Sequence, residues 1–270
     1  MNVPVKRVTA VGVTDDRLNE YGITRDEAKF MRAVVMAVNG ELEGYDLTQS
    51  MAATIKSLYD INEQKLRNAG LVRKHVGTNR RVYYSVTRNG QEACRLQQKH
   101  GPRVGDLGDH TPHRVGVELA RRYYDSRDDV QYVQTYTRSN GGVIDAVAMG
   151  RGTETIAAIE VEAGRTSADP DATGNGVGIN DYDSIRKDYE QLMEAGGEAV
   201  WVTRNHEIAG TVLRALTSGS SIQVNPSVET IRGVESGRIP MHILQKDHID
   251  AMSAPGLNRI ITFGQIRNQL

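Results

Sequence analysis

The C-terminal part of this chain contains acidic residues at positions where their carboxylates could bind a metal ion. Asp145 lies in one apolar run, Val143–Met149, and Glu160 and Glu162 end the next one. Residues 101–270 hold 23 Asp and Glu against 17 Lys and Arg, a balance that suits a metal site better than a groove for nucleic acid. In an extended strand Glu160 and Glu162 share a face, so both line a cleft or both are ordinary solvent-facing residues.

The N-terminal part carries the opposite charge. Although the whole chain has a net charge of −1, the segment Lys65–Lys99 contains nine basic residues and one acidic residue, Glu92. A surface that neutralises the phosphates of a nucleic acid needs such an excess of positive charge. For a charge run alone, a solvated surface is the alternative.

Apolar spacing in the N-terminal part predicts helices followed by a hairpin. Residues at turns of three and four predict the helices, Gly70 ends the third of them, and the period then changes to two. The expected elements are a helix at 26–38, a second helix from about 47, a third at 56–69, strands at 71–76 and 81–86, and a closing helix at 89–98.

Three helices followed by a basic hairpin resemble the winged helix-turn-helix of MarR-type DNA-binding proteins. The segments Leu66–Val72 and Tyr84–Gly90 carry the resemblance, as recognition helix and closing helix on either side of the wing. In that fold the third helix enters the major groove of double-stranded DNA and the hairpin lies along the backbone. The resemblance implies DNA contacts from the outward-facing Lys56, Ser57, Tyr59, Asn62 and Lys65 and from Arg73, Lys74, Arg80 and Arg81 of the wing. A winged helix that contacts protein is the alternative.

A second domain follows a segment without any period. That segment, 100–112, is rich in Gly, Pro, Asp and His and predicts a linker. The expected elements after it are a helix from His113, strands at 130–137, 143–149 and 155–162, a helix at 180–195, a strand at 198–203, a helix at 206–216 and a strand at Met241–Gln245. We therefore expect an α+β or α/β chain with an extension at 1–25, a winged helix at 26–99, a linker at 100–112 and an αβββαβ domain at 113–270.

This order, with acids at the ends of the second and third strands, resembles the PD-(D/E)XK nuclease superfamily, whose fold is that of the restriction endonucleases. Its signature is an acid on one strand and Glu-x-Lys on the next. The carboxylates together hold magnesium where it polarises a phosphate and activates water. The resemblance implies that Asp145 and Glu160 bind Mg²⁺ and that Glu118, on the preceding helix, is an additional catalytic carboxylate.

A second resemblance joins the two domains. The segments His113–Glu118, Ile144–Val147, Ile159–Thr166 and Ile185–Tyr189 are similar to the replication-relaxation family of plasmid proteins. Members of that family join an N-terminal winged helix to this kind of C-terminal domain. The resemblance extends over most of residues 26–216 and implies a role in plasmid, viral or mobile-element replication or mobilisation.

One catalytic position departs from the superfamily pattern. Where the superfamily has lysine, two residues after the second acid, this chain has Glu162, which cannot act as a cation. Lys187 on the next helix is the candidate for a lysine that has moved. Two alternatives stay open, namely that Glu162 is a further metal ligand, or that the domain has lost its chemistry and serves as a scaffold.

Composition limits the remaining classes. The single cysteine, Cys94, excludes a disulfide framework and a cysteine-rich zinc site, and no apolar stretch has the length of a signal peptide or a membrane span. We expect a cytoplasmic protein that binds double-stranded DNA, with a second copy of the chain as a further candidate partner, and that is a magnesium-dependent DNA endonuclease or nickase. The alternative is a non-enzymatic winged-helix transcriptional regulator whose inactive nuclease-like domain dimerises or binds a partner.

Overall fold

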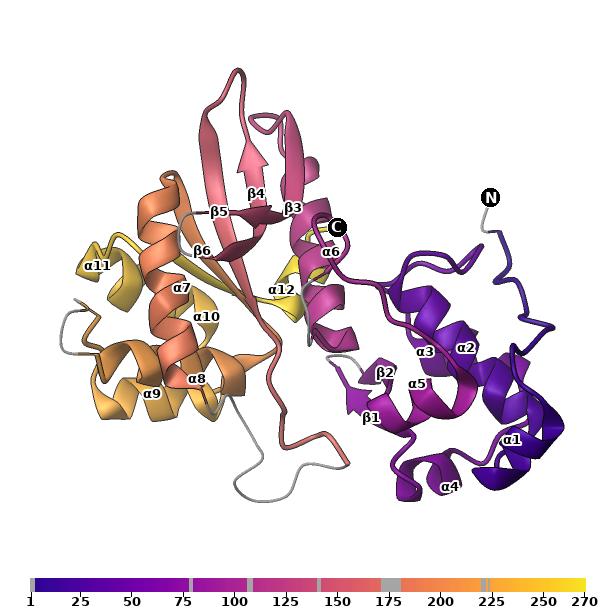
Figure 1. Cartoon of the computed structure of the whole chain (residues 1–270). Coiled ribbons are helices and arrows are strands. Elements are labelled where there is room, and N and C mark those ends of the chain that lie inside the picture. The colour runs from indigo at the N-terminus through magenta and orange to yellow at the C-terminus, as the bar shows by residue number, and fades with distance from the viewer. Residues whose placement is uncertain are drawn as a thin grey trace. The chain divides into compact units, whose positions relative to one another are not determined.

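The computed structural model describes residues 3–77, 80–105, 109–139, 142–170, 181–219, 222 and 224–270. The chain divides into two compact units. The first comprises Met1–His100 with His110–Pro112 and Ala168–Asp171, and the second comprises Gly101–Asp109, His113–Ser167 and Ala172–Leu270. Both units contain helices and strands, so the protein is α+β (Figure 1). No helix in the described ranges is long and apolar enough to cross a membrane.

The first unit is a helical body with one antiparallel hairpin. Its elements are α1 (Asp15–Glu20), α2 (Arg25–Val38), α3 (Met51–Thr54), η1 (Lys56–Leu58), α4 (Glu63–Asn68), β1 (Val72–Val76), β2 (Val82–Val86) and α5 (Arg88–Cys94). A capping box starts α2, because Thr24 and Glu27 each accept a hydrogen bond from the other's backbone N–H. The predicted first helix and the predicted hairpin are therefore present, and residues 1–25, expected as an extension, supply α1 to this unit.

The predicted third helix, 56–69, is wrong. The single turn η1 and the helix α4 are separated by Tyr59, which has an extended backbone. The Tyr59 ring meets Phe30 edge-on at 6.4 Å, and its hydroxyl accepts a 2.7 Å hydrogen bond from the backbone N–H of Val8. Tyr59 is therefore buried and does not face outward as expected. Asn62 then starts a new helix by accepting a hydrogen bond from the backbone N–H of Lys65.

The second unit is built around a five-stranded mixed sheet. Its elements are α6 (Thr111–Asp125), β3 (Tyr132–Arg138), β4 (Val143–Met149), β5 (Thr155–Glu162), α7 (Tyr182–Ala195), β6 (Glu198–Thr203), α8 (His206–Thr217), α9 (Val228–Glu235), α10 (Met241–Leu244), η4 (Gln245–Ile249), α11 (Asp250–Met252), β7 (Arg259–Thr262) and α12 (Phe263–Arg267). The strand order is β3-β4-β5-β6-β7, in which β3, β4 and β5 are antiparallel and β5, β6 and β7 are parallel. The predicted order αβββαβ is thus present.

The strand predicted at Met241–Gln245 is wrong, and the last strand is β7. Pro240 precedes helix α10 with a backbone that suits a helix start. Met241 and Leu244 are both buried, three residues apart on one helical face. So short an apolar run does not distinguish a strand from a helix by its period.

Helices cover both faces of the sheet (Figure 1). On one face Ala158 and Trp201 pack with residues of α7, α8 and α9 in a buried cluster. On the other face α6 approaches β5 so closely that a Cβ at Gly116 would lie 2.4 Å from a methyl group of Val161. Glu160 and Glu162 alternate with Val161 along β5, which places both on the face that α7 covers.

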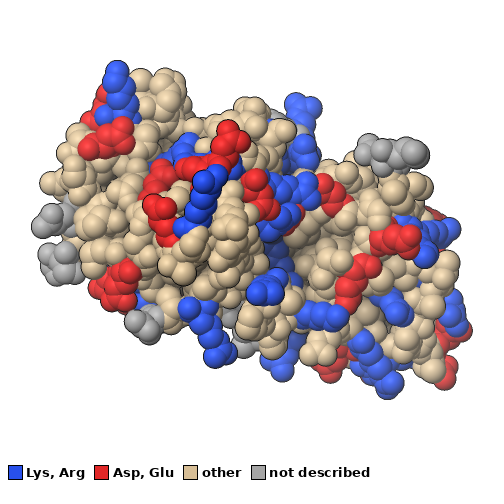
Figure 2. Space-filling model, turned by 90° about the horizontal axis from the view of Figure 1, so that it is seen from above, with Lys and Arg blue, Asp and Glu red and all other residues tan. Residues whose placement is uncertain are grey.

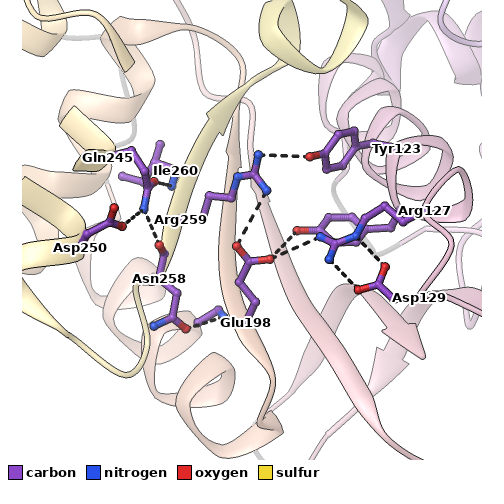
Figure 3. A network of polar contacts seen from close by, with 11 residues as sticks. Tyr123, Arg127, Asp129, Glu198, Gln245, Asp250, Asn258, Arg259 and Ile260 are labelled. Carbon is purple, nitrogen blue, oxygen red and sulfur yellow. Dashed lines mark hydrogen bonds and ion pairs between the residues drawn. The ribbon is translucent and has the colours of Figure 1, made fainter. Parts of the chain in front are cut away.

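A polar network ties α6, β6 and β7 together at the end of β5 and β6 far from Glu162 (Figure 3). Glu198, the first residue of β6, accepts a 3.3 Å hydrogen bond from the hydroxyl of Tyr124 and lies 3.7 Å from Arg127. Arg259 of β7 lies 3.9 Å from Glu198 and donates a 3.1 Å hydrogen bond to the hydroxyl of Tyr123. This network connects the elements at the end of the sheet opposite to Glu160 and Glu162.

Candidate active site

Asp145 lies where the ladder between β4 and β5 ends. The last described backbone partners at this end are Ala146 and Ile159. Beyond them, Oδ2 of Asp145 accepts a 2.8 Å hydrogen bond from the backbone N–H of Val161. The carboxylate therefore takes the place of a strand partner, and its position is set by the neighbouring strand.

Glu160, the predicted second acid, continues the same register opposite Asp145. Its side chain is 5% exposed, and its Oε1 has no hydrogen-bond partner within the described residues. Burial, followed by the charges of Asp145 and Asp188, raises the pKa of Glu160 well above its ordinary value. A buried carboxyl oxygen without a partner costs free energy, which a bound cation would offset.

Glu162 and Asp188 complete a group of four carboxyl groups with Asp145 and Glu160. Burial and then the charge of Asp188 raise the pKa of Glu162 to about 8. Burial and then the charge of Asp145 raise the pKa of Asp188, on α7, to about 7. The four groups thus act on one another, and Asp188 is a member that the sequence had not indicated.

His113 of α6 is the basic partner of these acids. Its Nε2 lies 3.0 Å from Oδ1 of Asp145 and 3.6 Å from Oδ1 of Asp109. Burial alone would lower the pKa of His113, but Asp145, with smaller contributions from Asp109 and Glu162, raises it to about 10. His113 therefore carries a positive charge at neutral pH. Sequence reasoning missed both contacts, because Asp109 falls in the expected linker and His113 fits no spacing of metal ligands.

A strained residue lies beside Asp145. Tyr136 of β3 has a φ of 52°, in the left-handed region. Its two chain neighbours pair with Ala146 and Ile144, which places Tyr136 opposite Asp145. A non-glycine residue in this region costs on the order of 1–3 kcal/mol, and such residues cluster at functional sites.

Two other predicted catalytic residues, Glu118 and Lys187, differ in how they relate to the four acids. Glu118 accepts hydrogen bonds from Arg121 and Arg122 of its own helix, at 2.6 to 2.9 Å. Burial opposes their effect, but the two arginines lower the pKa of Glu118. Lys187 is exposed on α7 and acts on the cluster through its charge, which lowers the pKa of Asp188.

The lysines expected to contact DNA lie in the first unit and are paired with glutamates. Glu63 contacts Lys56 at 2.6 Å and Lys74 at 2.8 Å. Lys65 lies 2.8 Å from the buried Glu27. Two carboxylates outside the basic segment Lys65–Lys99 therefore neutralise part of the charge that the sequence assigned to DNA binding.

Of the remaining residues expected to contact DNA, some form hydrogen bonds within the protein and others are exposed. Arg81 donates a 2.6 Å hydrogen bond to the backbone oxygen of Thr48, and Asn62 caps α4. Ser57, Arg73 and Arg80 are exposed. On the face of the molecule in Figure 2, Lys and Arg alternate with Asp and Glu rather than forming one uniform field.

The four acids fit a divalent cation by chemistry, although their present spacing is not that of a bound ion. No three His, Cys, Asp or Glu side chains in the described ranges are placed to hold one ion together. Burial and the neighbouring carboxylates favour the protonated form of Glu160, whereas a bound cation would favour its ionised form. Their oxygens are the ligands that Mg²⁺ prefers, and Oε1 of Glu160 is unsatisfied.

Comparisons of this chain with models of protein families, with curated proteins and with solved structures found no match. Its function is therefore inferred from its own residues and their geometry.

Proposed function

We propose that this protein is a magnesium-dependent DNA endonuclease or nickase of the PD-(D/E)XK type. The observation that supports the proposal most is the pair Asp145 and Glu160 on the adjacent strands β4 and β5. Val161 anchors the first carboxylate, and the second has a buried oxygen without a partner. The αβββαβ order of the elements around the pair agrees with that superfamily.

We assign roles to Asp145, Glu160 and Lys187. Asp145 and Glu160 hold the cation, which when bound polarises a phosphate and activates a water molecule. Glu160 lies beside Asp145 on the adjacent strand, so the two carboxyl groups would hold the ion from neighbouring positions. Glu162 supplies no positive charge, so Lys187 is assigned to stabilise the charge that develops on the phosphate.

The first unit supports DNA binding in this proposal. Helices α2, α3 and α4, followed by the hairpin β1–β2, have the element order of a winged helix-turn-helix. Arg73 on β1 and Arg80 before β2 are exposed, and we assign both guanidinium groups to phosphate contacts. Arg81 donates a hydrogen bond to the backbone oxygen of Thr48, so we assign it a structural role instead.

Cleavage of a supercoiled plasmid tests the enzymatic part. The full chain should convert the plasmid to nicked or linear form with Mg²⁺ or Mn²⁺, and EDTA should stop the reaction. Asp145→Asn and Glu160→Gln should each abolish cleavage while binding duplex DNA as the wild type does. Asp183→Asn is the matched control, because Asp183 lies on α7 with its side chain 90% exposed, and it should cut at the wild-type rate.

A non-enzymatic DNA-binding regulator is the second candidate function. The observation that favours it is Glu162 at the position of the superfamily's lysine. Such a regulator would bind a specific duplex and leave it intact with either ion. If both the wild type and Glu162→Lys left every DNA form uncut, the nuclease proposal would be refuted and DNA binding retained.

A further inference from the structure

Asp188 lies on the side of α7 that faces the sheet. Helix α7 packs against β4 and β5. Ile185, three residues before Asp188, and Leu192, four residues after it, belong to the buried cluster that contains Ala158 of β5. Residues three and four apart share a helical face, and Ala158 shares its strand face with Glu160. The helix therefore presents Asp188 toward the face that carries Glu160.

The Asp188 side chain is held in this orientation by a polar relay. Nε2 of Gln191 donates a 3.3 Å hydrogen bond to Oδ1 of Asp188. Oε1 of Gln191 in turn accepts a 3.2 Å hydrogen bond from the hydroxyl of Ser139. Gln191 is 5% exposed, so the relay is packed and limits the rotation of the carboxylate.

A negative charge at this position opposes folding of the metal-free protein. Asp188 interacts with Asp145, Glu160 and Glu162, and each of these interactions disfavours the ionised form of a carboxyl group. An asparagine would keep the acceptor that Gln191 needs and would remove the repulsion. Lys187, His113 and a hydrogen bond with Ser184 favour the ionised form of Asp188, but they do not offset its burial and the charge of Asp145. A cation bound among the four acids would supply the missing positive charge.

We propose that Asp188 is a third carboxylate ligand of the divalent cation, supplied by α7 in addition to Asp145 from β4 and Glu160 from β5. This inference rests on the proposed function, because it concerns the same ion. The unsatisfied Oε1 of Glu160 is the independent sign that a ligand belongs between these side chains. With Asp188 as a ligand, the bound ion ties α7 to the central strands of the sheet.

Thermal unfolding with and without the metal alone tests the assignment. Mn²⁺ and Mg²⁺ are titrated into the metal-free full chain and into Asp188→Asn, with Asp183→Asn as the exposed control on the same helix. In the metal-free state Asp188→Asn should melt at the same temperature as the wild type or higher. Its affinity for Mn²⁺ should fall at least about tenfold, because loss of a residue that only hydrogen-bonds a metal ligand already lowers metal affinity by about that factor. Asp183→Asn should bind Mn²⁺ as the wild type does.

The outcomes separate this inference from the proposed function. Wild-type Mn²⁺ affinity in Asp188→Asn, with affinity lost in Asp145→Asn, would overturn the role of Asp188 and leave the proposed metal site standing. No Mn²⁺ or Mg²⁺ binding by the wild type would overturn both. If Asp188→Asn failed to fold, a structural role would replace the proposed one. Asp188→Glu keeps the charge and displaces the carboxylate, so a folded Asp188→Glu with unchanged Mn²⁺ affinity would also overturn it.

Discussion

Replacing Glu162 by Gln should stabilise the metal-free protein at alkaline pH and have little effect at pH 5. Burial and Asp188 raise the pKa of the folded-state Glu162 from 4.5 to about 8. The folded protein therefore binds more protons than the unfolded chain between these two values, and its stability falls as the pH rises through that window. Well below pH 4.5 both states are protonated at this carboxyl group and the cost disappears.

The size of the effect follows from the shift. Each unit of pKa corresponds to about 1.4 kcal/mol, which sets an upper limit of about 5 kcal/mol for the cost of ionised Glu162. Rotation of the acids and access of water relieve part of that cost, so we expect Glu162→Gln to gain about 2 kcal/mol at pH 8.5. The charge of Asp188 adds to this gain, whereas the positive charge of His113 favours ionised Glu162 and reduces it.

Urea unfolding in EDTA at pH 5 and pH 8.5 measures this gain. Glu190→Gln, at an exposed position of α7, is the control and should change stability at neither pH. A Glu162→Gln variant that is no more stable than the wild type at pH 8.5 would refute the argument that the four acids repel one another in the metal-free protein.

The remaining predictions concern the missing cation, the DNA contacts and the ion pairs of the first unit. Glu162→Lys restores the superfamily pattern and should raise or preserve plasmid cleavage with Mg²⁺, and abolished cleavage would count against the assigned cation position. The double variant Arg73→Ala with Arg80→Ala should reduce the slope of log affinity for DNA against log salt concentration by about two. Filter binding in a series of KCl concentrations measures this slope, and an unchanged slope would show that the hairpin does not contact DNA. Burial raises the pKa of Glu63, but hydrogen bonds with Lys56, Lys74 and Tyr84 outweigh burial and lower this pKa to about 2. Ionised Glu63 therefore stabilises the fold above pH 4.5, and this stabilisation is lost as the pH falls toward 2. Glu63→Gln should therefore cost about 2 kcal/mol at pH 7 in a urea titration and almost nothing at pH 2.

Local sequence patterns were enough to predict the strands that carry the acids. The apolar runs Val143–Met149 and Thr155–Glu162 match β4 and β5 residue for residue. Because side chains of a strand alternate between its faces, Glu160 and Glu162 are expected on one face, where the structure has them. Both faces of these strands are buried, and strands of this kind appear in the sequence as short, nearly continuous apolar runs.

Contacts between distant residues could not be predicted from one sequence. His113 meets Asp145 across 32 residues, and nothing in the local pattern of either segment indicates the other. The third helix was overextended because the ring of Tyr59 finds a buried partner in Phe30, which overrides local helix propensity. The basic segment appeared more cationic than it is, since Glu63 precedes it by only two residues.

The location of the bound ion tests the central claim most directly. Crystals of the full chain grown with Mn²⁺ and measured at the manganese absorption edge should show an anomalous peak within coordination distance of the carboxylates of Asp145 and Glu160. A peak at any other position, or no peak there at saturating Mn²⁺, would contradict the account of this site as a metal-dependent nuclease centre.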